Sequence, residues 1–233
     1  MTSGWSVDRT QAPDGDGKRL WLPGAPTWDG NWERLAGRVY VGIRDGSLSP
    51  DAAFDLAVFL ADWATPHPVF EALAEASIEA ADGSRLASLA RDSLAVVGYV
   101  PDFRVEPRLL AELNQVLEVL VHDLRATGLT GTADAVLPDD LDLKNAYLRY
   151  QGSFGHTSGL TPSDVSRDGP ELLMLVADEF QDAVMGSLFG VWPVCPRHQL
   201  GAHPKVSERR AVWWCLGAAG HVIAAVGQWG DDL

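Results

Sequence analysis

Both cysteines of this 233-residue chain, and three of its six histidines, lie in residues 191–233. They are Cys195, His198, His203, Cys215 and His221. Thiolate and imidazole groups together suit a borderline-soft divalent ion, and a structural zinc site takes four such ligands in tetrahedral geometry. An ion held in this way fixes the path of every segment that reaches it. We therefore expect this end of the chain to fold around one ion.

The segment that carries these residues has the pattern of two strands joined by a turn. Residues 211–214 (Ala-Val-Trp-Trp) and 222–226 (Val-Ile-Ala-Ala-Val) are apolar, β-branched or aromatic, which favours strands. Glycine recurs between them, in residues 215–221, as expected of a turn. A second tight turn is predicted after Cys195, because Pro196 follows the cysteine and only two residues separate Cys195 from His198.

Residues 191–233 thus resemble a zinc-ribbon module. The resemblance implies that Cys195 and His198 belong to one metal-binding knuckle, and Cys215 and His221 to the other. It also implies one structural zinc per chain. A module of this size is too small to bury a large core, so we expect the ion to stabilise it and the ribbon to dock on the helix before it.

The identity of the fourth ligand stays open at this point. Zinc ribbons usually carry cysteine where this chain has His198, and five residues separate Cys215 from His221, which is wider than usual. His203 is therefore a substitute or additional ligand. The alternatives to a structural zinc are a hairpin with two reduced thiols, a disulfide, and a catalytic ion with an open position.

The middle of the chain is predicted to be helical, because apolar residues recur there at spacings of three and four. Ser49-Pro50-Asp51 has the order of a helix N-terminus, and Gly98 and Gly128 follow apolar stripes as stop signals. The predicted helices span residues 49–64, 69–80, 84–97, 107–127 and 170–189. Residues 129–165 are less regular.

We divide the chain by composition into a flexible N-terminal arm (residues 1–18), a mainly helical domain (19–190) and the ribbon-like module (191–233). In the helical domain, residues 19–32 read as an irregular segment anchored by tryptophans, and residues 38–43 alternate enough to predict a short strand. The expected fold class is α+β, mainly α, with the ribbon as a small C-terminal β-hairpin module.

The net charge of −14 argues against nucleic acid as the main partner, since no stripe of Lys and Arg is present to neutralise phosphates. An acidic surface favours a protein partner, and a basic one. No signal peptide or long apolar run appears, so we expect a cytoplasmic protein, in which free thiols or metal ligands are more common than disulfides. Abundant Ala and Arg beside only three Lys predict a bacterial, GC-rich genome.

Two other groups of residues attract attention. Asp178, Glu179 and Asp182 form an acidic face on the last predicted helix, which is typical of the solvent-exposed side of an amphipathic helix. Residues 155–159 (Gly-His-Thr-Ser-Gly) place a histidine between glycines, as a ligand-binding or an ordinary exposed loop would. No nucleophile elbow, phosphate loop or dinucleotide motif is present in the sequence.

These observations favour a non-enzymatic, zinc-stabilised protein-interaction module of accessory, regulatory or immunity type. A zinc-dependent hydrolase is the alternative, with three of the five Cys and His residues on the ion, water as the fourth ligand, and Glu208 or an acid of the last helix as the base. A third reading is nucleic-acid contact through a locally basic tail. That tail carries Arg197, Lys205, Arg209 and Arg210.

Overall fold

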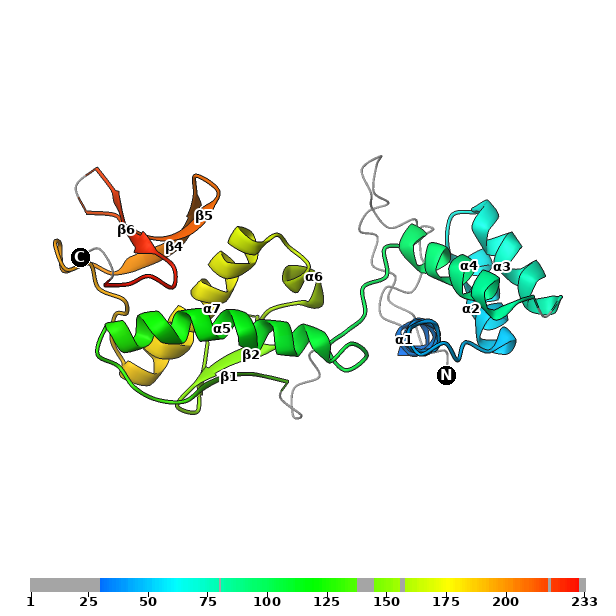
Figure 1. Ribbon diagram of the computed structural model, residues 1–233, viewed down its shortest axis with the longest axis horizontal. Coiled ribbons are helices and arrows are strands. Elements are labelled where there is room, and N and C mark those ends of the chain that lie inside the picture. Colours follow the sequence, from blue (N-terminus) through cyan, green and yellow to red (C-terminus); the bar gives the residue numbers. More distant parts are fainter. Residues whose placement is uncertain (1–29, 80, 138–144, 156–157, 218, 231–233) are drawn as a thin grey trace, which may run out of the picture. The chain divides into compact units, whose positions relative to one another are not determined.

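A computed structural model describes residues 30–79, 81–137, 145–155, 158–217 and 219–230. The chain divides between Pro101 and Asp102 into two compact units (Figure 1). The sequence-based division at residues 18 and 190 rests on composition and not on contacts between residues. Its first segment lies outside the described residues, and the boundary at residue 190 stays a prediction.

The first unit is a bundle of four helices with one apolar core. The helices are α1 (Gly30–Arg44), α2 (Pro50–Trp63), α3 (Pro68–Ile78) and α4 (Gly83–Val96). The start of α2 is as predicted, because the Ser49 side chain accepts a hydrogen bond from the amide of Ala52 and Pro50 occupies the first turn. His67, which has no special feature in the sequence, caps α3 by accepting a hydrogen bond from the amide of Val69.

The predicted strand at residues 38–43 is wrong, since these residues lie in the second half of α1. Trp32, Ala36 and Val39 are buried at spacings of four and three, which is the period of a helix. The short alternation of polar and apolar residues from Arg38 onward resembles a strand because it covers fewer than two helical turns. The helical pattern becomes visible only when Trp32 is included.

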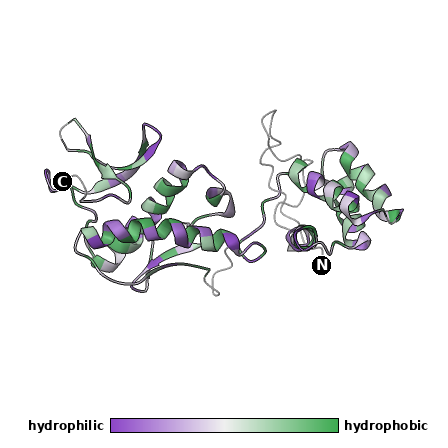
Figure 2. Ribbon diagram, viewed as in Figure 1, coloured by the Kyte–Doolittle hydropathy of each residue, from purple (hydrophilic) through white to green (hydrophobic). Residues whose placement is uncertain are grey.

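The second unit begins with α5 (Arg108–Ala126), a 19-residue helix whose apolar stripe can be followed in Figure 2. A small antiparallel sheet follows, with the strands in the order β1 (Ala133–Val136), β2 (Tyr147–Tyr150), β3 (Ser153–Phe154). After α6 (Pro162–Val165) comes α7 (Gly169–Leu188), and α7 packs on β2 and on α5. The sheet and α6 lie where the sequence predicts only irregular structure.

A second antiparallel sheet ends the chain, with the strands in the order β4 (Ala202–Ser207), β5 (Arg210–Cys215), β6 (His221–Ala225). The strands predicted at residues 211–214 and 222–226 correspond to β5 and β6. The predicted strands do not include β4, because the histidine, proline and lysine in it hide its alternation. The described residues thus form an α+β fold that is mainly α, as the sequence predicts.

The last sheet shares its core with α5 and α7 instead of forming a separate one. Trp192, Trp213 and Trp229 are buried in the same apolar cluster as Phe180 of α7 and Leu120 of α5. Trp192 packs edge-to-face against both Phe180 and Trp213, with ring centroids 5.8 and 5.6 Å apart. The predicted docking of the ribbon on the preceding helix is therefore present, and α5 takes part as well.

No described helix is both long enough and apolar enough to span a bilayer.

Candidate metal centre

Two of the predicted ligands, Cys195 and His198, lie in a tight loop that leads into β4. The amide of Cys195 donates to the carbonyl of Leu200 over 2.8 Å, and the amide of Gln199 donates back to the carbonyl of Cys195 over 2.8 Å. Gln199 has a left-handed backbone, with φ of 55°, which closes the turn. The loop therefore presents the side chains of Cys195 and His198 from one short knuckle.

The other two residues are placed by strand pairing. Cys215 is the last residue of β5 and His221 is the first of β6, and they stand directly opposite each other in the sheet. Between them, the amide of Gly220 donates to the carbonyl of Gly217 over 3.0 Å. Gly220 has φ of 78°, a conformation that favours glycine. The wide spacing of Cys215 and His221 thus suits a pair that flanks the turn of a hairpin.

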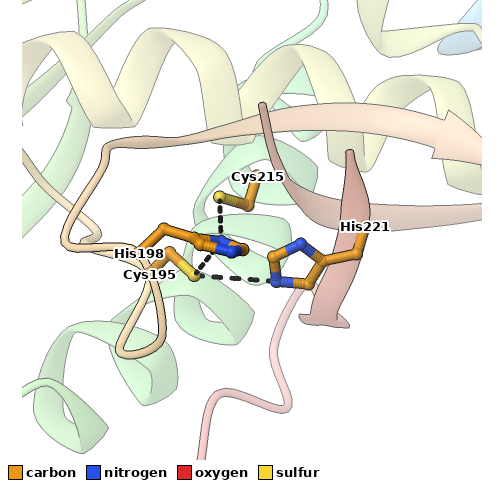
Figure 3. A group of neighbouring side chains, drawn as sticks. All are labelled: Cys195, His198, Cys215 and His221. Carbon is orange, nitrogen blue, oxygen red and sulfur yellow. Dashed lines mark hydrogen bonds between the residues drawn. The ribbon is translucent and has the colours of Figure 1, made fainter. Parts of the chain in front are cut away.

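Strand pairing also brings the two halves together, because Ala202 at the start of β4 is the register partner of Cys215. The result is one cluster of Cys195, His198, Cys215 and His221, whose ligand atoms all lie within 4.8 Å of one another (Figure 3). We call these four residues the Cys/His cluster. Both cysteines are buried and both histidines are half-buried.

Three sulfur–nitrogen distances within the cluster are close to those of a tetrahedral zinc site. With Zn–S bonds of about 2.3 Å and Zn–N bonds of about 2.0–2.1 Å, the sulfur and nitrogen ligands of one ion stand roughly 3.5–3.6 Å apart. Nδ1 of His198 lies 3.8 Å from Sγ of Cys195 and 3.4 Å from Sγ of Cys215. Nε2 of His221 lies 3.6 Å from Sγ of Cys195. Figure 3 marks these three contacts with dashed lines.

The surroundings of the thiols favour thiolates. Burial raises the pKa of Cys195, but the backbone amides of His198 and Arg197, the Cys215 thiol and the Arg197 charge lower it more, so the net pKa lies below the ordinary value. The sulfur of Cys215 accepts a hydrogen bond from the amide of Gly217 over 3.2 Å. Each sulfur therefore has backbone donors that stabilise negative charge, as zinc-bound cysteines require.

Gly217 also packs against the cluster more closely than any other residue type would allow. A Cβ atom at this position would stand 2.6 Å from Nδ1 and Cγ of the His198 ring. The ring is consequently held between Gly217 and the two sulfurs. The histidine is positioned by the turn of the opposite knuckle, and an added methyl group would push its nitrogen away from the sulfurs.

A buried carboxylate ties the sheet to α5. Asp123 has no exposed surface, and its oxygens accept hydrogen bonds from three donors in the last 21 residues. These donors are the indole of Trp213 at 2.7 Å, the amide of Gly227 at 2.7 Å and the amide of Trp229 at 2.8 Å. This one side chain therefore fixes β5 and the segment after β6, on both sides of the Cys/His cluster.

A buried amide makes a similar link to α7. The side-chain nitrogen of Gln181 donates to the carbonyl of Trp192 over 2.7 Å and to that of Ala202 over 2.6 Å, just before and just after the first knuckle. The Trp192 indole in turn donates to Thr127 over 2.8 Å. Sequence reasoning missed these links, although Gln181 and Asp123 each interrupt or adjoin an apolar helix stripe, which is a readable signal.

The structure separates the predicted site residues into two groups. The four residues of the Cys/His cluster come together. His203, the open alternative, is not in the cluster: it is exposed on β4 and near enough to Asp178 to affect its pKa. Glu208, the base that a hydrolase would use, lies in the turn between β4 and β5, at the end of the strands away from Cys215. His156 lies outside the described residues.

The acidic face of α7 is only partly exposed to solvent, so its assignment as a solvent-exposed side is wrong for Glu179. This residue is 3% exposed, and its Oε1 atom has no hydrogen-bond partner among the described residues. Burial raises the pKa of Glu179 to about 7, with further contributions from Asp182 and Asp178. Gly155 leaves room for it, since a Cβ there would stand 2.9 Å from Oε1.

Comparison of the chain with known protein families, with characterised proteins and with solved structures finds no match.

Proposed function

We propose that this chain binds one zinc ion through Cys195, His198, Cys215 and His221, and that it acts as a non-enzymatic protein-interaction module. The observation that carries the proposal is the set of sulfur–nitrogen distances, 3.4–3.8 Å, which match the spacing of ligands around a tetrahedral zinc. Two sulfurs and two imidazole nitrogens are the donor set of many structural zinc sites.

The ion would be structural because the chain itself fills all four positions. Cys195 and Cys215 would bind as thiolates, each stabilised by backbone amides. His198 would use Nδ1 and His221 Nε2, the atoms that face the sulfurs. Zinc would supply a cross-link between the two knuckles, in addition to the pairing of β4 with β5 and the packing of Gly217 on the His198 ring. Asp123 and Gln181 would hold the cross-linked sheet on α5 and α7.

A hydrolase is less well supported by this arrangement. Activation of water needs an open position on the ion and a base close to it. Four protein ligands leave no such position, and two thiolates reduce the Lewis acidity of zinc. Glu208 is removed from Cys215 by the length of β5, which at about 3.3 Å per residue is some 17 Å. The acids of α7 do not join the Cys/His cluster.

The experiment is to compare the stability and partner binding of the intact protein with those of two sets of variants. Cys215→Ser should lower thermal stability and binding of co-purified partners together. Glu171→Gln and Glu208→Gln, which change exposed acids outside the cluster, should leave thermal stability unchanged and should not weaken partner binding. A turnover assay with esters, amides and phosphodiesters completes the test. Zinc-dependent hydrolysis that is lost in an acid variant while the zinc stays bound would overturn the proposal in favour of the hydrolase.

A further inference from the structure

Exposed apolar side chains gather around the Cys/His cluster. Among the described residues, seven of the thirteen large apolar side chains that are exposed lie within residues 188–222. Four of them adjoin cluster residues in the chain, and we call these four the apolar collar: Val194, Leu200, Leu216 and Val222. Their exposed fractions are 36%, 48%, 67% and 43%. Exposed apolar residues that occur together commonly mark an interaction site, whereas single ones do not.

The collar is compact because the cluster is compact. Val194 precedes Cys195, Leu216 follows Cys215 and Val222 follows His221, so each Cα is about 3.8 Å from that of a cluster residue. Leu200 is held beside Cys195 by the hydrogen bond from the amide of Cys195 to its carbonyl. The four ligand atoms lie within 4.8 Å of one another. Three collar residues therefore adjoin the proposed metal site in the chain, and Leu200 is joined to it by one backbone hydrogen bond.

The collar continues onto one face of the sheet. Trp213 of β5 is buried in the core, so the next residue, Trp214, points to the opposite face. His203 of β4 and Val222 of β6 are the register partners of Trp214 and lie on that same face. The ammonium group of Lys205 lies 4.3 Å from the centre of the Trp214 ring. His203, Trp214 and Val222 thus connect the apolar collar to Lys205, the cation of β4.

The charge of this module is opposite to that of the rest of the chain. Residues 191–233 carry four basic side chains against three acidic ones, which leaves a net charge of −15 on residues 1–190 out of the total of −14. The four basic residues are Arg197, Lys205, Arg209 and Arg210, and all are exposed. None forms a salt bridge with a described acidic residue. Ser207 and Arg210 are register partners, so Arg209 lies in the turn of the β4–β5 hairpin, whose tip is hydrophilic (Figure 2).

We propose that the apolar collar and the cations beyond it, Lys205, Arg209 and Arg210, form a docking surface for an acidic protein segment with apolar residues at one end. The apolar end would cover the collar, and the carboxylates would follow β4 toward the hairpin tip. The proposal rests on the proposed function, because the collar is assembled only when both knuckles are held at the metal site. Charge complementarity decides the partner, because exposed cations that form no salt bridge with a described acidic residue, on an otherwise acidic protein, select an acidic surface.

A protein fits this surface better than a nucleic acid does. Single-stranded nucleic acids need aromatic faces on which bases can stack. The Trp214 ring is already covered by Lys205, and a Cβ on Gly220 would stand 2.7 Å from it, so the ring is held close by the turn as well. Aliphatic side chains such as Leu200 and Leu216 offer nothing to a phosphate backbone, whereas they are suitable anchors for apolar residues of a partner.

The test uses the full chain and a labelled synthetic peptide with leucines at one end and glutamates at the other. A peptide of about 12 residues is long enough, at ~3.3 Å per residue, to reach from the collar past the hairpin tip. Fluorescence polarisation should show binding that weakens as salt is raised, since screening reduces attraction between exposed charges. A peptide with lysine in place of glutamate should bind at least about tenfold more weakly.

Two variants locate the surface. Leu200→Ser with Leu216→Ser should weaken peptide binding by about tenfold or more, as loss of an interface anchor does. Arg209→Glu with Arg210→Glu should weaken binding and remove most of the salt dependence. The matched control is Ile78→Ser, which changes an equally exposed apolar residue in the other unit and should have no effect.

The zinc content of each sample separates the outcomes. If the chain holds zinc but the glutamate peptide does not bind, or binds equally to the collar variant, the docking surface is wrong and the metal site stands. Tighter binding of a single-stranded oligonucleotide than of the peptide would also overturn the docking surface. A chain that holds no zinc would overturn the proposed function, and this inference with it.

Discussion

The two units of this protein bury polar groups in different ways. In the first unit, the buried polar side chains among the described residues are Ser77 and Ser93, and each hydroxyl donates to a carbonyl four residues earlier in its own helix. In the second unit, Asp123 and Gln181 bond to groups that lie 11 to 106 residues away. The buried side chains of the first unit therefore join its helices by apolar packing, whereas the second unit fixes its last sheet with specific long-range bonds.

This difference indicates what each unit is built to hold. A bundle whose polar groups are satisfied locally tolerates small shifts between its helices. A Cys/His cluster does not, because ligand atoms must stay within a few tenths of an ångström of a tetrahedron. The long-range bonds of Asp123 and Gln181 reach segments that carry the knuckles. The bonds of Asp123 and Gln181 therefore restrain the positions of Cys195, Cys215 and His221 through the strands and loops to which these residues belong.

Removal of the metal should have the largest effect and should separate the two units. Structural zinc contributes on the order of 10 kcal/mol to the folding of small zinc modules. Chelation should therefore increase hydrogen exchange from residue 191 onward, while α1–α4 keep their protection. A uniform increase over both units would contradict the comparison. Exchange that rises in α5 and α7 together with the sheet would show that the second unit folds around the metal as a whole.

Substitution of Asp123 should have the next largest effect. Asp123→Ala leaves two buried donors and one half-buried donor without an acceptor, and the loss of such a group costs about 3–5 kcal/mol. Denaturant unfolding should show this loss in the second unit alone. Glu118→Ala is the matched control, because Glu118 is exposed on the same helix and its removal should cost less than about 0.5 kcal/mol. Equal effects of the two substitutions would mean that Asp123 is not a structural link.

Glu179 should make the stability of the second unit depend on pH. The unfolded chain releases this proton near pH 4.5, whereas the folded protein holds it to about pH 7. Between these values the folded state binds more protons, so stability falls as the pH rises, by about 3 kcal/mol at most. Glu179→Gln should remove this slope and be more stable than the intact protein above pH 7.

The control for Glu179 is Glu171→Gln, an exposed acid of the same helix, for which the slope should be kept. Urea unfolding at several pH values between 4 and 8 measures both variants. Identical slopes in Glu179→Gln and the intact protein would show that Glu179 is ionised in the folded state at neutral pH.

Substitution of glycine by alanine should have the smallest effect, and it can be compared directly between the two units. Gly217→Ala should displace the His198 ring and weaken zinc binding by about 10–100-fold, the usual result of disturbing the support of a metal ligand. Gly83→Ala, at the start of α4 in the first unit, meets nothing within 4 Å and should be neutral or slightly stabilising. Competition with a zinc-binding dye measures the affinity, and an unchanged value for Gly217→Ala would exclude this role of the glycine.

The sequence predicts the parts of this fold that depend on local pattern. Apolar periodicity locates the helices near residues 50–63, 108–126 and 169–188 to within a few residues, and Gly128 marks the end of the second of them. The prediction fails at α1, where a short alternation resembles a strand, and at β1–β3, where strands of two to four residues carry too little pattern. Short strands are defined by their partners, which lie elsewhere in the chain.

The candidate site divides in the same way. Residue type and spacing are enough to select the cysteines and histidines, because few other roles bring them together. They do not choose between His203 and His221, since that choice depends on the register of β5 and β6 and on the face of β4. Asp123 stays hidden because its donors lie 90 to 106 residues away. Glu179 looks like one acid among several until its burial is known.

The most direct test of this account is to measure the metal in protein purified without chelators, and to determine its ligands by X-ray absorption spectroscopy. The account predicts one zinc per chain, bound by two sulfurs at about 2.3 Å and two nitrogens at about 2.0–2.1 Å. His221→Ala should release the ion and His203→Ala should leave it bound. Protein without metal, or an ion that keeps a water ligand, would contradict the structural zinc site proposed for Cys195, His198, Cys215 and His221.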